Sequence, residues 1–282
     1  MSTELLGEIV SWEMNGQVLA LNQIQEALRD SGLDPNEANE LTNRQAFGRA
    51  CRELKANRSI DKLQIGTGPI AKFQLTKKET TVTGTIDFDY EAIIELNCDT
   101  GAISCPESSE LEKQATELLA FAAQTRNSQD VTRIVQRLFR RNADLFPINS
   151  KGVAYFAPEA HREFTGKVDD FLQKLGGKLQ RFPVPRGTEQ GNASVKDAVQ
   201  GGLAAMVDEL NEVVSHWDET TRKATMEKAF ERYDRVAVKI DAYATYLECA
   251  QDNLKAKLAE AKAELAKKIA AAHPEPAEQS AA

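Results

Sequence analysis

The sequence contains few of the side chains on which catalysis and metal binding usually depend. Its 282 residues include only three histidines, His161, His216 and His273, and four widely spaced cysteines. It has no Gly-x-Ser-x-Gly elbow, His-x-x-x-His pair or catalytic-cysteine signature, so a hydrolytic site would have to be assembled from dispersed residues. Zinc usually takes four ligands in close pairs, and neither Cys98 nor Cys105 has a second pair nearby. We therefore expect no enzyme, no catalytic residues, no metal and no cofactor.

Long hydrophobic runs are also missing. No apolar stretch approaches the roughly 18 residues needed to cross a bilayer. Residues 1–16 carry acidic side chains where a secretory signal needs basic ones. The scattered cysteines make a poor disulfide framework for a chain of this length and suit a reducing compartment. We therefore expect a cytoplasmic protein that has no membrane partner.

Charge is unevenly distributed along the chain. The formal net charge is −8, from 35 basic and 43 acidic residues, which disfavours a general polyanion binder. Residues 44–78, however, contain nine basic and two acidic residues, residues 79–125 contain one and ten, and residues 126–186 contain twelve and six. Two basic regions thus flank an acidic one. Anion binding by the basic regions and chance variation over a solvated surface both explain this pattern.

The residues up to the end of the first basic region predict three helices and a β-hairpin. The helices follow from apolar residues at helical spacing, and the hairpin follows from two alternating segments around a Gly-rich turn at 66–69. The expected elements are a helix over 21–33, a turn and short helix over 34–41, a third helix from Thr42 or Asn43 to Asn57, and strands over 60–64 and 70–75. In the third helix the basic side chains project away from the apolar stripe, so the basic face points outward.

This order of elements, over residues 21–77, resembles that of winged helix-turn-helix domains. In such domains the third helix commonly enters the major groove of DNA, and the hairpin touches the phosphate backbone. The resemblance implies that the DNA contacts are made by Gln45, Arg49, Arg52 and Lys55 on the third helix and by Lys72 beside the hairpin. Winged helices also bind proteins, so the fold alone does not decide the partner.

A second, similar series of elements follows the acidic region. Residues 79–108 are rich in β-branched residues and predict two or three further strands. Beyond them we expect a helix over 109–124, a basic helix over 130–142, a hairpin over 145–148 and 153–156, a helix over 158–175 and a strand near 178–184. The order of helix, basic helix and hairpin again resembles a winged helix.

The helix over 130–142 is the most basic in the chain. Arg133, Arg137, Arg140 and Arg141 cover the surface around its apolar stripe. Contact with phosphate, contact with an acidic protein and plain solvation remain three alternatives for these arginines.

The C-terminal part is predicted to be helical. Residues 187–194 are expected to form a linker, and apolar residues then mark one long helix up to Trp217. From residue 219 a heptad repeat brings Tyr233, Ile240, Leu247 and Leu254 to one face. A single helix over 219–272 would be about 80 Å long and would need partners along its length. These four residues are therefore predicted to mediate self-association, and residues 273–282 are expected to be disordered.

Together these patterns predict an α+β fold. It would have winged-helix-like units at 1–78 and 109–186, a β-rich segment at 79–108, the linker at 187–194 and a helical hairpin or coiled coil at 195–272. The favoured function is a non-catalytic DNA-associated protein that contacts double-stranded DNA through its basic helices and forms a homo-oligomer, or pairs with another coiled-coil protein. The alternative is a scaffold or adaptor that binds proteins and no nucleic acid. If the two basic faces converge on one side of the fold, the DNA hypothesis gains support.

Overall fold

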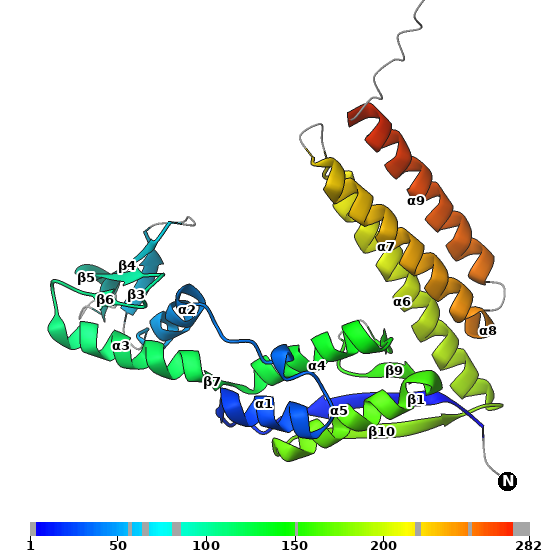
Figure 1. The fold of residues 1–282 in the computed structure, drawn as a ribbon, viewed down its shortest axis with the longest axis horizontal. Helices are drawn as coiled ribbons and strands as arrows, with labels where there is room; N and C mark the ends of the chain where they lie inside the picture. Colours follow the sequence, from blue (N-terminus) through cyan, green and yellow to red (C-terminus); the bar gives the residue numbers. More distant parts are fainter. Residues whose placement is uncertain are drawn as a thin grey trace, which may run out of the picture. The chain divides into compact units, whose positions relative to one another are not determined.

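The computed structural model describes residues 4–55, 58–63, 68–80, 86–149, 152–217, 221–247 and 250–272. The fold is α+β with several sheets and a C-terminal helical region, as predicted (Figure 1). The chain forms two compact units, each built from segments that are distant in sequence. Unit 1 comprises Met1–Glu13, Phe139–Gly166 and Leu179–Ala282, and unit 2 comprises Met14–Leu138 and Lys167–Lys178.

Unit 2 contains a four-stranded antiparallel sheet covered on one face by two helices. The strands, in spatial order, are β3 (Arg58–Lys62), β4 (Ile70–Thr80), β5 (Ile86–Asn97) and β6 (Ile103–Ser104). The covering helices are α2 (Asn43–Glu53) and α3 (Ser109–Gln124), and Figure 1 shows α3 beneath the sheet and α2 beside it. Their apolar stripes pack against alternate residues of β4 and β5, with Phe47 and Leu75 fully buried in the shared core.

Hydrogen bonds at the helix ends explain where α2 and α3 begin. The Thr42 hydroxyl accepts from the Gln45 backbone N–H, and the Gln45 side chain accepts from the Thr42 N–H at 3.1 Å, which is a capping box. Ser108 caps α3 through the Leu111 N–H at 3.3 Å. The capping residues thus separate each helix from the irregular segment before it.

The remaining elements of unit 2 are short or shared with unit 1. They are β2 (Leu19–Ala20), α1 (Leu21–Asp30), the 3-10 helix η1 (Pro35–Glu37), β7 (Thr125–Arg126), most of α4 (Ser128–Asn142) and the second half of α5 (Arg162–Lys174). β2 and β7 pair antiparallel. The helices and strands over 21–77 occur in the expected order, and the winged-helix resemblance stays a prediction. Residues 66–67 of the predicted turn, the helix end at Asn57 and the tail 273–282 lie outside the described residues.

Unit 1 begins with a sheet that brings the N-terminus next to the middle of the chain. Its strand order is β10 (Lys178–Pro185), β1 (Leu5–Glu13), β9 (Tyr155–Pro158) and β8 (Phe146–Pro147), and the 3-10 helix η2 (Glu159–His161) follows β9. β1 runs antiparallel to β9, with Gly7 opposite Pro158. The Trp12 ring stacks on Tyr155, with centroids 5.2 Å apart. The sequence analysis did not predict β1, so the pairing partner of the N-terminus was missed.

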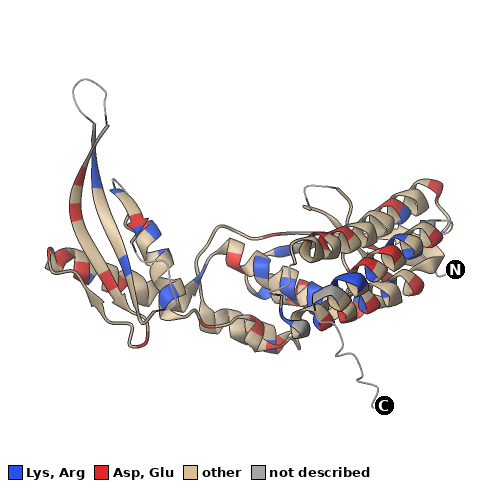
Figure 2. Cartoon of the chain, turned by 90° about the horizontal axis from the view of Figure 1, so that it is seen from above, with Lys and Arg blue, Asp and Glu red and all other residues tan. Residues whose placement is uncertain are grey.

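Three long helices complete unit 1. They are α6 (Glu189–Ser215), α7 (Lys223–Ala242) and α9 (Ala250–Ala272), with the single turn α8 (Ala244–Leu247) before α9. The prediction of one unbroken helix over 219–272 is wrong, because α7 ends at Ala242 and the chain reverses so that α9 runs back beside it (Figure 1). The predicted linker is also helical from Glu189 onward. Figure 2 shows basic and acidic residues interspersed along this bundle.

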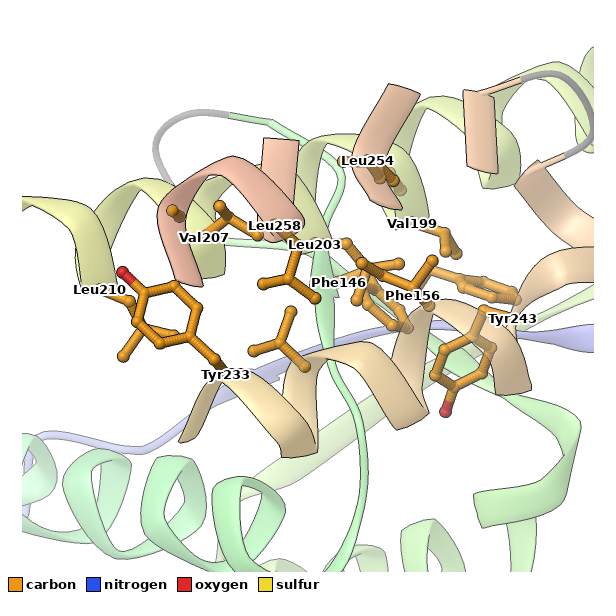
Figure 3. Close-up of a cluster of buried hydrophobic side chains, with 14 of the residues drawn as sticks. Phe146, Phe156, Val199, Leu203, Val207, Leu210, Tyr233, Tyr243, Leu254 and Leu258 are labelled. Atoms are coloured by element: carbon orange, nitrogen blue, oxygen red, sulfur yellow. The ribbon is translucent and has the colours of Figure 1, made fainter. Parts of the chain in front are cut away.

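The heptad residues lie in the core of this bundle. Tyr233, Ile240 and Leu254 are buried in one cluster with Val199, Leu203 and Leu210 of α6. Figure 3 shows Tyr233 beside Leu210. The side chain of Leu247 lies outside the described residues. A heptad repeat shows that a helix face is covered, and here the covering helices belong to the same chain. The three described residues, which the sequence predicted to mediate self-association, are therefore covered by helices of the same chain.

Two adjacent glycines in α6 provide a test of how tightly the bundle packs on the sheet. A Cβ at Gly202 would lie 2.7 Å from Cδ1 of the buried Phe146, whereas nothing lies within 4 Å of a Cβ at Gly201. We expect Gly202→Ala to lower the free energy of unfolding by about 1–3 kcal/mol through overpacking. Gly201→Ala should raise it by about 0.5–1 kcal/mol through helix propensity. Urea unfolding measures both values, and changes of the same sign would contradict this packing.

Candidate functional site

Unit 2 contains a cavity of about 250 Å³ into which three arginines project. Arg49 and Arg52 come from α2, Arg133 comes from α4, and Phe121 of α3 lines the same space. Val18, Asn127, Gln129 and Asp130 are among the other lining residues. We call this space, defined by Arg49, Arg52, Arg133, Phe121 and Asp130, the arginine cavity.

The amphipathic pattern of the two basic helices explains why these arginines meet. In α2 the buried residues Ala46, Phe47 and Ala50 face the sheet, and Arg49 and Arg52, three residues apart, are neighbours on a side that the core does not use. In α4 the apolar residues on either side of Arg133 are buried. The two basic regions are separated in sequence by the acidic one, and the fold brings one part of each together.

A two-pronged ion pair lines the arginine cavity. Arg49 donates from both terminal nitrogens to Asp130, with Nη1–Oδ2 at 2.6 Å and Nη2–Oδ1 at 2.7 Å. The Asp130 side chain is only 8% exposed, and Nη1 of Arg133 lies 3.8 Å from its Oδ1. Asp130 also accepts from the Asn127 backbone N–H at 3.1 Å, which anchors the start of α4. One carboxylate therefore fixes the relative position of α2 and α4.

A fourth arginine, Arg126, is buried near Arg49 and Asp130. Its guanidinium donates to the carbonyl oxygens of Thr125 at 2.7 Å, Ala123 at 3.1 Å and Asn39 at 2.7 Å. Burial and the nearby charge of Arg49 lower the pKa of Arg126, although Asp130 partly opposes this shift. Arg126 was not predicted from the sequence. Its guanidinium donates to carbonyl oxygens at the C-terminal end of α3, and such a contact leaves no repeating pattern in the sequence.

The exposed side chains that line the arginine cavity are partly basic and partly apolar. Arg133 is 67% exposed, and Arg52 is exposed with its Nε donating to the Gly48 carbonyl at 3.2 Å. Phe121 is 55% exposed and Val18 is 54% exposed, so two large apolar side chains lie beside the cations. Phe121 lies outside the apolar stripe of α3, and this offset was the one signal in the sequence that could have identified it.

Three other residues predicted to contact DNA form hydrogen bonds or ion pairs within the fold. Lys72 pairs with Glu95 across β4 and β5, with Nζ–Oε1 at 2.5 Å. Arg137 donates to the Glu37 carbonyl at 2.5 Å and lies 3.4 Å from its carboxylate. The Gln45 side chain belongs to the capping box of α2. These three residues do not line the arginine cavity.

The last three predicted contact residues are exposed but lie elsewhere. Lys55 follows α2, and Arg140 and Arg141 are in the last turn of α4. None of them lines the arginine cavity. Of the nine residues proposed for nucleic-acid contact, the fold thus gathers Arg49, Arg52 and Arg133 at one place.

Within the described part of the chain, no group of three or more His, Cys, Asp or Glu side chains is placed to hold a metal ion. No helix among those residues combines the length and apolarity needed to cross a membrane.

The chain belongs to a family of unknown function, DUF6744, whose model matches residues 5–275. No curated protein and no solved structure matches the chain. The family match therefore covers both units and leaves the function to be inferred from the site.

Proposed function

We propose that this chain is a non-catalytic DNA-associated protein that contacts phosphate through the arginine cavity. The observation that supports this proposal is the convergence of Arg49, Arg52 and Arg133, from two separate basic regions, on one concave surface of unit 2. Arginine is suited to this role because its planar guanidinium forms paired hydrogen bonds with phosphate oxygens.

The three arginines differ in how they would act. Arg49 is held in place by Asp130 and uses only part of its five-donor capacity in that pair. Arg52 and Arg133 have exposed side chains, and Arg133 keeps only a long contact of 3.8 Å with Asp130, so both can meet a phosphate. Because the net charge of the whole chain is −8, long-range attraction to DNA is weak and binding depends on this local group.

The test is the salt dependence of DNA binding. We expect Arg52→Ala combined with Arg133→Ala to reduce the slope of log K against log salt by about 1.4–1.8, since each lost phosphate contact removes about 0.7–0.9. Fluorescence anisotropy with labelled oligonucleotides between about 50 and 200 mM salt measures this slope.

A matched control removes the same charge elsewhere in unit 2. Arg29 of α1 and Lys113 of α3 are exposed and do not line the arginine cavity. Arg29→Ala combined with Lys113→Ala should leave the slope close to that of the wild type. A slope that is unchanged in the arginine variant, or equally reduced in both variants, would reject the phosphate contacts.

A scaffold or adaptor role is the second candidate, and one feature favours it. Phe88 and Tyr90 on β5 are both more than half exposed, and the Lys78 ammonium lies 5.9 Å from the Phe88 ring centroid. Exposed aromatic residues of this kind often dominate protein interfaces. If the protein binds neither single-stranded nor double-stranded DNA, the scaffold or adaptor role is favoured.

A further inference from the structure

The arginine cavity combines cations with an exposed ring in a concave site. A groove binder for duplex DNA needs a convex element, usually a helix or ribbon, that projects into the major groove. Here Arg49 and Arg52 of α2, the helix predicted to enter the groove, line a cavity, and Arg49 is paired with Asp130. The shape therefore favours a ligand that enters the protein.

The cavity has a volume of about 250 Å³ and is partly open to solvent. One nucleobase is a flat group that can enter a concave space of this kind beside Phe121. Bases of a duplex are also stacked and paired inside it, so their faces are out of reach of Phe121.

The lining residues match the parts of a single nucleotide. The Phe121 ring and Val18 offer apolar surface for the face of a base. Asn127 and Gln129 line the same space. The Asn127 Oδ1 already accepts from the Asp130 backbone N–H at 3.0 Å, so Gln129 is the residue with a full side-chain amide to offer a base edge. Arg52 and Arg133 supply the positive charge for the adjoining phosphates.

We infer that the arginine cavity takes one unpaired base of single-stranded DNA beside Phe121, with the flanking phosphates on Arg52 and Arg133. This inference rests on the proposed function, because it assumes that the arginine contacts are made with DNA. It replaces the double-stranded partner expected from the sequence with a single strand.

The experiment compares three labelled probes of equal length with the full chain at about 50 mM salt. They are a 20-nucleotide mixed-sequence strand, the duplex of that strand, and a strand of the same length whose central residues lack bases. We expect the intact strand to bind at least about ten-fold more tightly than the duplex and the abasic strand. The abasic strand keeps its phosphates, so it isolates the contribution of the bases.

Variants of Phe121 connect the preference to this residue. Phe121→Ala should weaken binding of the intact strand by about ten-fold or more, which is the scale of one lost base–aromatic stack. Phe121→Trp keeps an aromatic face and should retain binding. Since Phe121 is 55% exposed, both variants are expected to fold, and circular dichroism checks this.

The outcomes separate this inference from the proposed function. Equal or tighter binding of the duplex, or no effect of Phe121→Ala on the intact strand, would overturn the single-strand inference while salt-dependent binding through Arg52 and Arg133 still stood. Absence of binding to all three probes would overturn the proposed function as well. Binding of the abasic strand as tightly as the intact strand would show that phosphates alone are recognised, which also overturns the inference.

Discussion

Replacing Asp130 with alanine is expected to lower the free energy of unfolding of unit 2 by about 3 kcal/mol or more. Removing one partner of a buried ion pair leaves the other charge without compensation, which costs about 3–5 kcal/mol. The Arg49 side chain is 25% exposed, so we expect a value near the lower end of that range. The buried Arg126 lies close enough for its charge to oppose that of Arg49, and this repulsion adds to the loss once the carboxylate is gone.

Hydrogen exchange of peptides from α2 and α4 is the appropriate measurement, because both tryptophans, Trp12 and Trp217, belong to unit 1 and do not report on unit 2. Arg49→Met in the Asp130→Ala background provides the control. It removes the unpaired cation and should restore part of the lost stability, so the two changes should not be additive. A loss of under about 1 kcal/mol in Asp130→Ala, or full additivity, would show that the pair does not hold α2 and α4 together.

Replacing Asp144 with asparagine is expected to destabilise unit 1 by about 2–4 kcal/mol at pH 7, with the difference shrinking in acid. Asp144 accepts from the Tyr243 hydroxyl at 2.6 Å and from the Lys239 ammonium, and Nε2 of His161 lies 3.7 Å from its Oδ2. Hydrogen bonds to a charged group contribute about 1.5–3 kcal/mol each, and part of this is offset by the cost of burying the carboxylate.

The sign of the pH dependence follows from the pKa of Asp144. Burial alone would raise it, but the nearby His161 and the hydrogen bonds from Lys239 and Tyr243 outweigh burial and hold the pKa well below the ordinary value. A depressed pKa gives stability that is complete above the unfolded pKa of about 3.9 and is lost as the pH falls toward the folded pKa. The wild type and the Asp144→Asn variant should therefore differ most at neutral pH and converge below about pH 4.

Urea unfolding followed by tryptophan fluorescence measures this difference, since Trp12 and Trp217 report on unit 1. Tyr243→Phe serves as the comparison, because it removes one hydroxyl donor and keeps the carboxylate, and it should cost less than Asp144→Asn. If the gap between the wild type and Asp144→Asn stays constant from pH 7 to pH 3, the ionised carboxylate is not the source of the stability.

Local patterns in the sequence predicted most individual helices. The helix expected over 109–124 is α3 at the same bounds, and the basic helix over 130–142 is the larger part of α4. These predictions are confirmed. They succeeded because an apolar stripe and a capping residue can both be recognised from neighbouring residues in the sequence. The heptad repeat was equally visible, but it gives only the face that is covered. Neither the reversal after Ala242 nor the identity of the covering helices can be inferred from it.

The arginine cavity was predictable only in its parts. The outward direction of Arg49, Arg52 and Arg133 follows from the stripes of their own helices. Their convergence depends on the pairing of Asp130 with Arg49, which are 81 residues apart, and no local pattern encodes that distance. The role of Phe121 could not be predicted. The sequence does not show whether an aromatic residue outside an apolar stripe is exposed or covered by another helix.

The position of β1 has a consequence for synthesis on the ribosome. β1 pairs with β9, about 150 residues later in the chain, and lies next to β10, which is later still. At about 5–20 residues per second, translation leaves this first strand without its partners for roughly 10 to 30 s. Its apolar residues, among them Leu6 and Val10, are buried in the finished unit and have nothing to pack against during that interval. The sheet of unit 1 is thus completed only after the strands that flank β1 have emerged.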